Sequence, residues 1–375
     1  MLKHGFELMT EDELPSISNK SLFKNVYHFS ENFLTSHLSK IREIRLDLKY
    51  RSEDEAHRFI KNVEKDSFKF LNNLRSLELI CDKCLLQNDF FNNFSTNSLE
   101  ELDISCDMLS EIGCDLFADV KNSLTRLSLF NCQITNIKNN TFNELKNLKK
   151  LDLSWNYFEI NNSNLFNELV NLESLKLIRC GLIDVDNDLF CSLVNLKELN
   201  LKMNQFKTIK SNWFKGLINL KVLNLSNCEI FKIENDSFKE LCNLEELDLN
   251  SNNIDTIERK SLQNLPNLKI LDLKQCKIKS IEENSFSNMQ KLEELYLTKN
   301  DIHLLKKENF NGLTNLKSLD LRGNNFLQLI NDPFVNLKNL EDLFLHDFDF
   351  KSLRNDECIK LKTNNDFLLN DFSFI

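Results

Sequence analysis

The stretch Leu196-Lys-Glu-Leu199-Asn-Leu201-Lys-Met-Asn204-Gln-Phe206 decides the fold, because its frame returns along most of the chain. The frame is L-x-x-L-x-L-x-x-N/C-x-L, and its first leucine recurs at intervals of 24 residues. These first leucines are Leu124, Leu148, Leu172, Leu196, Leu220, Leu244, Leu268, Leu292, Leu316 and Leu340. A looser form persists at Leu99 and Leu74, and more weakly at Ile41. A fixed period of this length predicts stacked repeats rather than separate globular domains.

Each unit predicts one short strand followed by a return segment. In Leu199-Asn200-Leu201, the period-two alternation turns the leucines into the core and Asn200 outward. Strands from successive repeats must then lie parallel, about 4.8 Å apart. The return segment carries an apolar residue, usually phenylalanine, and a leucine three positions later, as in Phe190 and Leu193. Because this segment is bulkier than the strand, we expect an α/β solenoid shaped as a horseshoe. It has about 12–13 repeats, parallel strands on the concave face, and irregular or short helical segments on the convex side.

The ninth position of the frame, where the chain leaves the strand, is predicted to be structural. Cysteine and asparagine alternate there from 132 to 300, so the period is 48 residues rather than 24, which indicates duplication of a two-repeat unit. An asparagine amide both donates and accepts hydrogen bonds, whereas a buried thiol is a small apolar group with a weak donor. The predicted structural ladder consists of Cys132, Asn156, Cys180, Asn204, Cys228, Asn252, Cys276, Asn300 and Asn324.

The two ends of the chain depart from the regular frame. Residues 1–40 are expected to form an irregular N-terminal cap and residues 354–375 a C-terminal cap or tail. Residues 41–353 form the solenoid, with regular repeats from 124. Caps are needed because a terminal repeat exposes one apolar face and an open strand edge.

Composition and charge disfavour several classes of partner. The formal net charge is −10, with acidic and basic residues interspersed, so we expect no nucleic acid partner. No apolar run reaches the ~18 residues of a membrane span, and residues 1–15 lack the apolar stretch of a signal peptide. We therefore expect no membrane insertion and a cytoplasmic location. The cysteine count of 11 is odd, which fits reduced thiols better than a closed disulfide framework.

The sequence shows no constellation of residues for catalysis or metal binding. It lacks GxGxxG, GxxxxGK[ST], HExxH and GxSxG, and its histidines are scattered. Cys81-x-x-Cys84 has no second pair at metal spacing. We therefore expect a protein that is not an enzyme and holds no cofactor or metal.

The frame LxxLxLxxNxIxxIxxxxFxxLxxL resembles the 24-residue typical class of leucine-rich repeat proteins, such as Toll-like receptors, slit-type guidance proteins and small leucine-rich proteoglycans. The resemblance covers roughly residues 74–353. It implies protein recognition on the concave face, often in signalling, adhesion or innate immunity. Extracellular members usually carry cysteine-clustered caps, whereas here no cysteine precedes Cys81 and only Cys358 follows the repeats.

Outward-facing positions of the strands indicate where a partner binds. Large apolar side chains gain nothing from facing solvent, and aromatic residues beside an arginine are typical of interface hot spots. The primary candidates for binding a protein ligand, at the seventh and eighth positions of consecutive repeats, are Phe130, Trp155, Ile178, Arg179 and Met203. The secondary candidates are Tyr296, Arg322, Phe344 and His346.

Two hypotheses of function remain. In the first, the chain is a non-enzymatic interaction scaffold that binds a protein ligand on its concave face. In the alternative, it is a secreted or cell-surface module for recognition, adhesion or innate immunity with atypical or missing caps, which would place it outside the cell.

Overall fold

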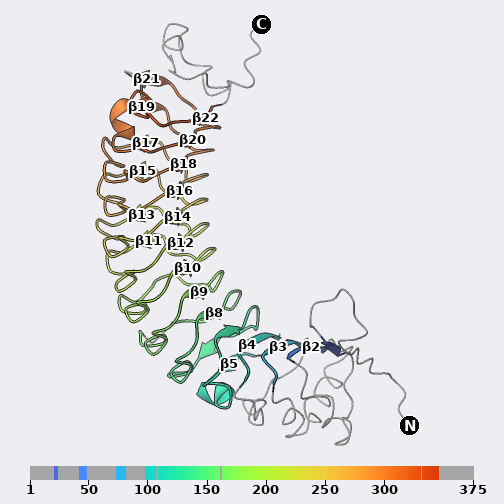
Figure 1. Ribbon diagram of the computed structural model, residues 1–375. Coiled ribbons are helices and arrows are strands. Elements are labelled where there is room, and N and C mark those ends of the chain that lie inside the picture. Colours follow the sequence, from blue (N-terminus) through green and yellow to red (C-terminus); the bar gives the residue numbers. More distant parts are fainter. Residues whose placement is uncertain are drawn as a thin grey trace, which may run out of the picture. The chain divides into compact units, whose positions relative to one another are not determined.

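The computed structural model describes residues 21–23, 42–48, 73–81, 98–106, 109–160, 163–330 and 332–345. The chain forms two compact units, Met1–Leu182 and Ile183–Ile375. In both units each coil contributes one strand to a parallel sheet, so each unit is a solenoid of stacked repeats (Figure 1). The expected C-terminal cap, residues 354–375, lies outside the described residues.

The first unit carries its main sheet in chain order. Its strands are β1 (Ser21–Phe23), β2 (Glu43–Leu48), β3 (Ser76–Cys81), β4 (Glu101–Cys106), β6 (Arg126–Ser128), β8 (Lys150–Asp152) and β9 (Ser174–Lys176). A smaller sheet pairs β5 (Glu111–Ile112) with β7 (Asn136–Ile137), and a 3-10 helix, η3, spans Cys114–Phe117. Because β1 pairs in parallel with β2, the sheet already includes part of residues 1–40, the segment expected to be an irregular cap.

The second unit repeats this plan. Its main sheet contains β10 (Glu198–Asn200), β12 (Val222–Asn224), β14 (Glu246–Asp248), β16 (Ile270–Asp272), β18 (Glu294–Tyr296), β20 (Ser318–Asp320) and β22 (Asp342–Phe344). Smaller sheets pair β11 (Thr208–Ile209) with β13 (Lys232–Ile233), β15 (Thr256–Ile257) with β17 (Ser280–Ile281), and β19 (Leu304–Lys306) with β21 (Gln328–Ile330). A 3-10 helix, η4, spans Lys307–Phe310. Turns and two- or three-residue strands make up most of the return segments.

The alternation within each strand separates the core from the exposed face of the sheet. Leu199 and Leu201 are buried, whereas Asn200 between them is half-buried. The register advances by one repeat per strand, so that Leu223 pairs with Leu199 and with Leu247. Each core leucine therefore packs against its equivalents in the neighbouring repeats.

The phenylalanines of the return segments line the other side of the core, as the sequence predicts. Phe142 and Phe166 in the first unit are fully buried, and their ring centroids lie 6.2 Å apart. Phe214 and Phe238 in the second unit stack in the same way at 5.8 Å. Core packing thus accounts for the phenylalanine spacing.

The ladder asparagines satisfy the backbone of two neighbouring bends at once. The Oδ1 atom of Asn252 accepts hydrogen bonds from the backbone N–H groups of Cys228 at 3.0 Å and Ile230 at 2.9 Å. Its Nδ2 donates to the carbonyl oxygens of Leu225 at 2.9 Å and Leu249 at 2.7 Å. One side chain, 2% exposed, thereby satisfies four buried backbone groups that have no strand partner.

The side chains of the ladder cysteines act only as hydrogen-bond donors. The Sγ of Cys228 donates to the carbonyl oxygen of Leu201 at 3.2 Å, and Cys276 does the same to Leu249 at 3.1 Å. A thiol supplies this donor but has no strong acceptor to offer in return. Asparagine and cysteine therefore play different parts in the ladder.

The alternation of asparagine and cysteine is also visible in the backbone. The residue after each ladder cysteine has a positive φ: Gln133, Gly181, Glu229 and Lys277. After three of the ladder asparagines, the next residue instead donates its N–H to the preceding repeat: Tyr157 to Ile134, Asn253 to Ile230 and Asp301 to Ile278, at 2.7–3.0 Å. The geometry of the bends therefore has the 48-residue period of the sequence.

We expect Asn252→Ala to destabilise the protein by about 3–5 kcal/mol, because it leaves the buried N–H groups of Cys228 and Ile230 and the oxygen of Leu225 without partners. The oxygen of Leu249 keeps its bond from Cys276. Urea denaturation of the full chain measures this cost. The control is Asn243→Ala, which removes a single bond, at 2.8 Å, between an exposed side chain and the oxygen of Ile218, and costs about 1 kcal/mol. Equal costs for the two variants would contradict the ladder role of Asn252.

Candidate functional site

The primary candidates lie at a bend with an unusual backbone conformation. At the eighth position of the frame, φ is positive in each repeat from 131 to 323, with values of 62° at Trp155, 53° at Arg179 and 62° at Met203. Glycine and asparagine adopt this conformation readily, whereas large side chains do so rarely. The bend itself thus favours residues such as Asn131 or Gly323 and gives no local reason for a tryptophan or an arginine.

Three of the primary candidates form one cluster on the exposed face of the first unit's sheet. The ring centroids of Phe130 and Trp155 lie 6.2 Å apart, and the guanidinium carbon of Arg179 lies 4.4 Å from the centroid of the Trp155 ring. Phe130 is 42% exposed and Trp155 is 38% exposed. The cluster therefore presents a cation–π pair and a second aromatic ring to solvent.

Tyr157 completes this cluster, although it is not among the residues predicted from the sequence. Its hydroxyl accepts a hydrogen bond from Nε of Arg179 at 3.2 Å, so the guanidinium is held by Trp155 and Tyr157 together. Gly181 has a φ of +73°, and a Cβ added there would lie 3.1 Å from Cδ1 of Tyr157. The sequence signal was an aromatic residue two positions after Trp155, on the same repeat. We call Phe130, Trp155, Tyr157 and Arg179 the aromatic–arginine patch.

The other two primary candidates hold different places. Ile178 is half-buried, and its carbonyl oxygen accepts a hydrogen bond from the N–H of Trp155 at 2.7 Å. Met203 is half-buried and belongs to the second unit. Neither residue belongs to the aromatic–arginine patch.

Two of the secondary candidates, Tyr296 and Phe344, are aromatic residues whose rings each contact a cation of the preceding repeat. Nζ of Lys274 lies 3.8 Å from the centroid of the Tyr296 ring and 3.0 Å from a carboxylate oxygen of Asp272. The guanidinium of Arg322 lies 5.0 Å from the Phe344 ring centroid and donates to both carboxylate oxygens of Asp320, at 3.0 and 2.6 Å. Each cation thus joins an aspartate of its own repeat to an aromatic ring of the next.

Neighbouring charged groups shift the pKa values of Tyr296 and Asp320. A hydrogen bond to Glu294 at 2.5 Å, followed by burial, raises the pKa of Tyr296 to about 12. Partial burial opposes ionisation of Asp320, but its bonds from Arg322 hold the pKa of that carboxyl below its usual value. The Tyr296 and Phe344 rings thus each contact a cation of the chain that is itself paired with an aspartate. His346 lies outside the described residues.

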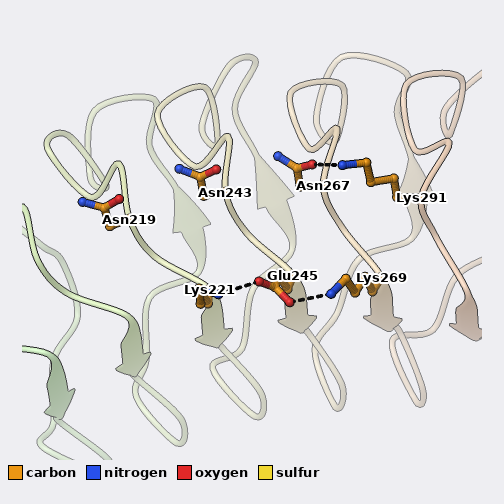
Figure 2. A pocket seen from close by; sticks show the side chains of 7 residues that line it. All are labelled: Asn219, Lys221, Asn243, Glu245, Asn267, Lys269 and Lys291. Atoms are coloured by element: carbon orange, nitrogen blue, oxygen red, sulfur yellow. Dashed lines mark hydrogen bonds and ion pairs between the residues drawn. The ribbon is translucent and has the colours of Figure 1, made fainter.

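A groove of about 430 Å³ lies beside the sheet of the second unit, next to the starts of β12, β14 and β16 (Figure 2). Its lining residues are Asn219, Lys221, Asn243, Glu245, Asn267, Lys269 and Lys291. Glu245 accepts hydrogen bonds from Lys221 at 2.8 Å and Lys269 at 2.7 Å, and these bonds lower its pKa to about 2 (Figure 2). Oppositely charged side chains of neighbouring repeats therefore pair with one another at this edge of the sheet.

The asparagines of the groove belong to a second ladder, which the sequence predictions did not include. Each one precedes the first leucine of a repeat and donates to a carbonyl oxygen of the preceding repeat, as Asn267 does to Cys242 at 2.7 Å. Lys291 takes the place of an asparagine and instead donates to Oδ1 of Asn267 at 2.6 Å. The Asn-Leu pair recurring every 24 residues was the available signal. These contacts give the groove a structural role at the edge of the sheet.

Metal ligands and membrane spans were sought within the described residues. No three His, Cys, Asp or Glu side chains gather there to hold a metal ion. No helix in that part of the chain is long and apolar enough to cross a bilayer.

Comparison with known proteins shows the fold that the repeats predict. The leucine rich repeat family model matches residues 97–158, 171–230, 218–278, 266–326 and 290–347. A search of curated proteins gave no match. A leucine-rich repeat protein of Leptospira interrogans is 26% identical, with a TM-score of 0.63 over 84% of this chain and 74% of that one.

Two other solved structures share the fold at lower identity. Mouse RP105, solved in complex with MD-1, is 24% identical, with a TM-score of 0.67 over 82% of this chain. TLR13, solved in complex with ssRNA13, is 19% identical, with a TM-score of 0.50 over 83% of this chain. This chain spans 51% of RP105 and 62% of TLR13, and these likenesses concern the fold alone.

We expect tryptophan fluorescence to separate the patch from the core. Of the two tryptophans, Trp155 is 38% exposed and Trp213 is fully buried. Trp155→Phe should remove the component that acrylamide quenches and leave blue-shifted emission from Trp213. Arg179→Ala should increase quenching of Trp155, because the guanidinium covers one face of its ring. An unchanged quenching constant would show that Arg179 does not lie on the ring in solution.

Proposed function

Because the chain belongs to the leucine-rich repeat family, we propose that it is a non-enzymatic interaction protein that binds a protein partner on the exposed face of its sheet. The partner contacts the aromatic–arginine patch of the first unit. The observation that carries this proposal is the stacking of Arg179 on Trp155, at 4.4 Å, beside the exposed ring of Phe130.

The energetic balance at the patch supports binding over a structural role. Phe130, Trp155 and Tyr157 are 42%, 38% and 58% exposed, so each keeps a large apolar surface in water that the fold does not bury. Trp155 and Arg179 also occupy a backbone conformation that costs large side chains more than glycine or asparagine. A partner that covers these rings recovers about 25 cal/mol for each Å² of apolar surface removed from water.

The side chains of the patch are also held in place before binding. The Trp155 ring lies against a face of the Arg179 guanidinium, whose Nε donates to the Tyr157 hydroxyl, so Arg179 loses little rotamer freedom when a partner binds. Tryptophan, tyrosine and arginine are the residues most enriched among interface hot spots. The second set, around Tyr296 and Phe344, fits this description less well because its cations, Lys274 and Arg322, are already paired with Asp272 and Asp320.

We expect the double variant Trp155→Ala, Arg179→Ala to weaken binding by roughly 30- to 1000-fold, as loss of about 2–4 kcal/mol at a hot spot predicts. Proximity labelling with the intact chain identifies the partner, and calorimetry with the purified pair measures the affinity. Phe231→Ala is the matched control, because Phe231 is 56% exposed but lies outside the patch. Unchanged affinity in the double variant removes the patch as the binding site.

We also propose that the protein works in a reducing compartment, as the sequence hypothesis of a cytoplasmic scaffold requires. The thiols of Cys114 and Cys242 are exposed. Exposed thiols persist in the cytosol and are oxidised or paired in extracellular proteins.

Thiol labelling of protein purified from its native source at pH 8 tests this location. Cys114 and Cys242 should react at once. Cys228 and Cys276 should not, because burial raises the pKa of each thiol to about 12 and the reactive thiolate is scarce four pH units lower. Cys114 or Cys242 recovered as a disulfide would instead support the secreted alternative.

A further inference from the structure

Two basic residues lie directly opposite each other at the start of the strands that lead to Phe130 and Trp155. Arg126 on β6 and Lys150 on β8 are register partners, and both side chains are exposed. Neighbouring strands lie about 4.8 Å apart, and like charges that face each other across a sheet are destabilising. Arg126 has a carboxylate nearby, since its Nη1 lies 3.5 Å from an oxygen of Glu101. Among the described residues, Lys150 has no such partner.

Acidic residues that face each other in the second unit each have a hydrogen-bond donor or a cation as a partner. Asp248 and Asp272 are also register partners, but each has a donor: Nδ2 of Asn224 lies 2.8 Å from Asp248, and Nζ of Lys274 lies 3.0 Å from Asp272. Along the third position of the same strands, Glu246 and Glu294 are separated by the neutral Ile270. Like charges are thus separated or compensated there, whereas the positive charge of Lys150 is not.

Arg179, like Lys150, has no carboxylate partner among the described residues. Its Nε is bound by Tyr157 and one face of its guanidinium by Trp155, and no carboxylate of the described residues pairs with it. Its two terminal nitrogens therefore remain as a preoriented pair of donors. A guanidinium held in this way matches the two oxygens of a carboxylate.

We propose that the patch binds an acidic peptide segment of the partner. One carboxylate takes both terminal nitrogens of Arg179, a second lies against Lys150 and relieves its repulsion with Arg126, and an apolar side chain of the segment packs on Phe130 and Trp155. This rests on the proposed function and adds the chemistry of the ligand: aspartate or glutamate next to a large apolar residue.

A polyanion such as RNA suits this surface less well than a short acidic peptide. Two of the basic residues of these strands are already paired, each with its own carboxylate: Arg126 with Glu101 at 3.5 Å and Lys176 with Asp152 at 3.9 Å. The chain as a whole has a net charge of −10, which repels a long polyanion. A short segment with two or three carboxylates suits the two uncompensated cations.

A library of random dodecapeptides displayed on phage, selected on the full chain, tests the proposal. We expect the enriched peptides to carry Asp or Glu beside an aromatic or aliphatic residue. Synthetic copies of them should bind at least about 10-fold more weakly to Lys150→Gln and to Arg179→Gln, because each loses a charge-assisted contact. Lys260→Gln, which removes an exposed lysine in the second unit, is the matched control and should bind as the unaltered protein does.

The outcomes separate this inference from the proposed function. Peptides that depend on Trp155 but not on Lys150 or Arg179, or that lack enriched acidic residues, overturn the acidic ligand and leave the patch as a binding site. Peptides unaffected by Trp155→Ala overturn both. Tighter binding of a single-stranded RNA dodecamer through the same residues, or self-association that Arg179→Gln abolishes in light scattering, also overturns the acidic peptide. Unchanged circular dichroism in each variant establishes that lost binding is not lost folding.

Discussion

The whole solenoid depends on satisfying the backbone where each repeat leaves its strand. At that bend the chain cannot continue the sheet, and its N–H and C=O groups are buried, so they need other partners. Asn252 supplies four of these bonds from one side chain and joins two repeats in doing so. The cysteines that alternate with the asparagines add only a donor from their thiols, as Cys228 does to Leu201. The repeats are therefore coupled through the bends as well as through the leucine core.

The same constraint explains where the candidate binding residues are displayed. Closing the bend requires a positive φ at the eighth position in each repeat from 131 to 323. That position faces out of the core, so its side chain is free to vary although its backbone is fixed. Trp155 and Arg179 occupy it in consecutive repeats and stack on each other. A structural requirement shared by the repeats thus provides a row of rigid attachment points, and one pair of them carries the aromatic–arginine patch.

The repeat frame predicted most of the fold because the relation between neighbours is simple. Residues 24 apart become register partners, so the pairing of Leu223 with Leu199 and Leu247 could be read from the period. The same rule identified Phe130, Trp155 and Arg179 as neighbours. It missed Tyr157 and Lys274, because their contacts depend on side-chain reach rather than on shared position in the frame: Tyr157 meets Arg179 across 22 residues, and Lys274 reaches the next repeat's Tyr296.

The sequence by itself determined the solenoid, its strand register, its core and the ladder residues, because each follows from a period that repeats without gaps through residues 124–340. Only the tertiary structure decided which exposed side chains act together. Trp155 and Tyr296 looked alike as outward-facing aromatic residues, yet Lys274 bridges Tyr296 to Asp272, whereas Arg179 on Trp155 keeps its terminal nitrogens available. The physical reason is that charge compensation acts over 3–4 Å between side chains of adjacent repeats, and the rotamers that set those distances are not encoded in the repeat period.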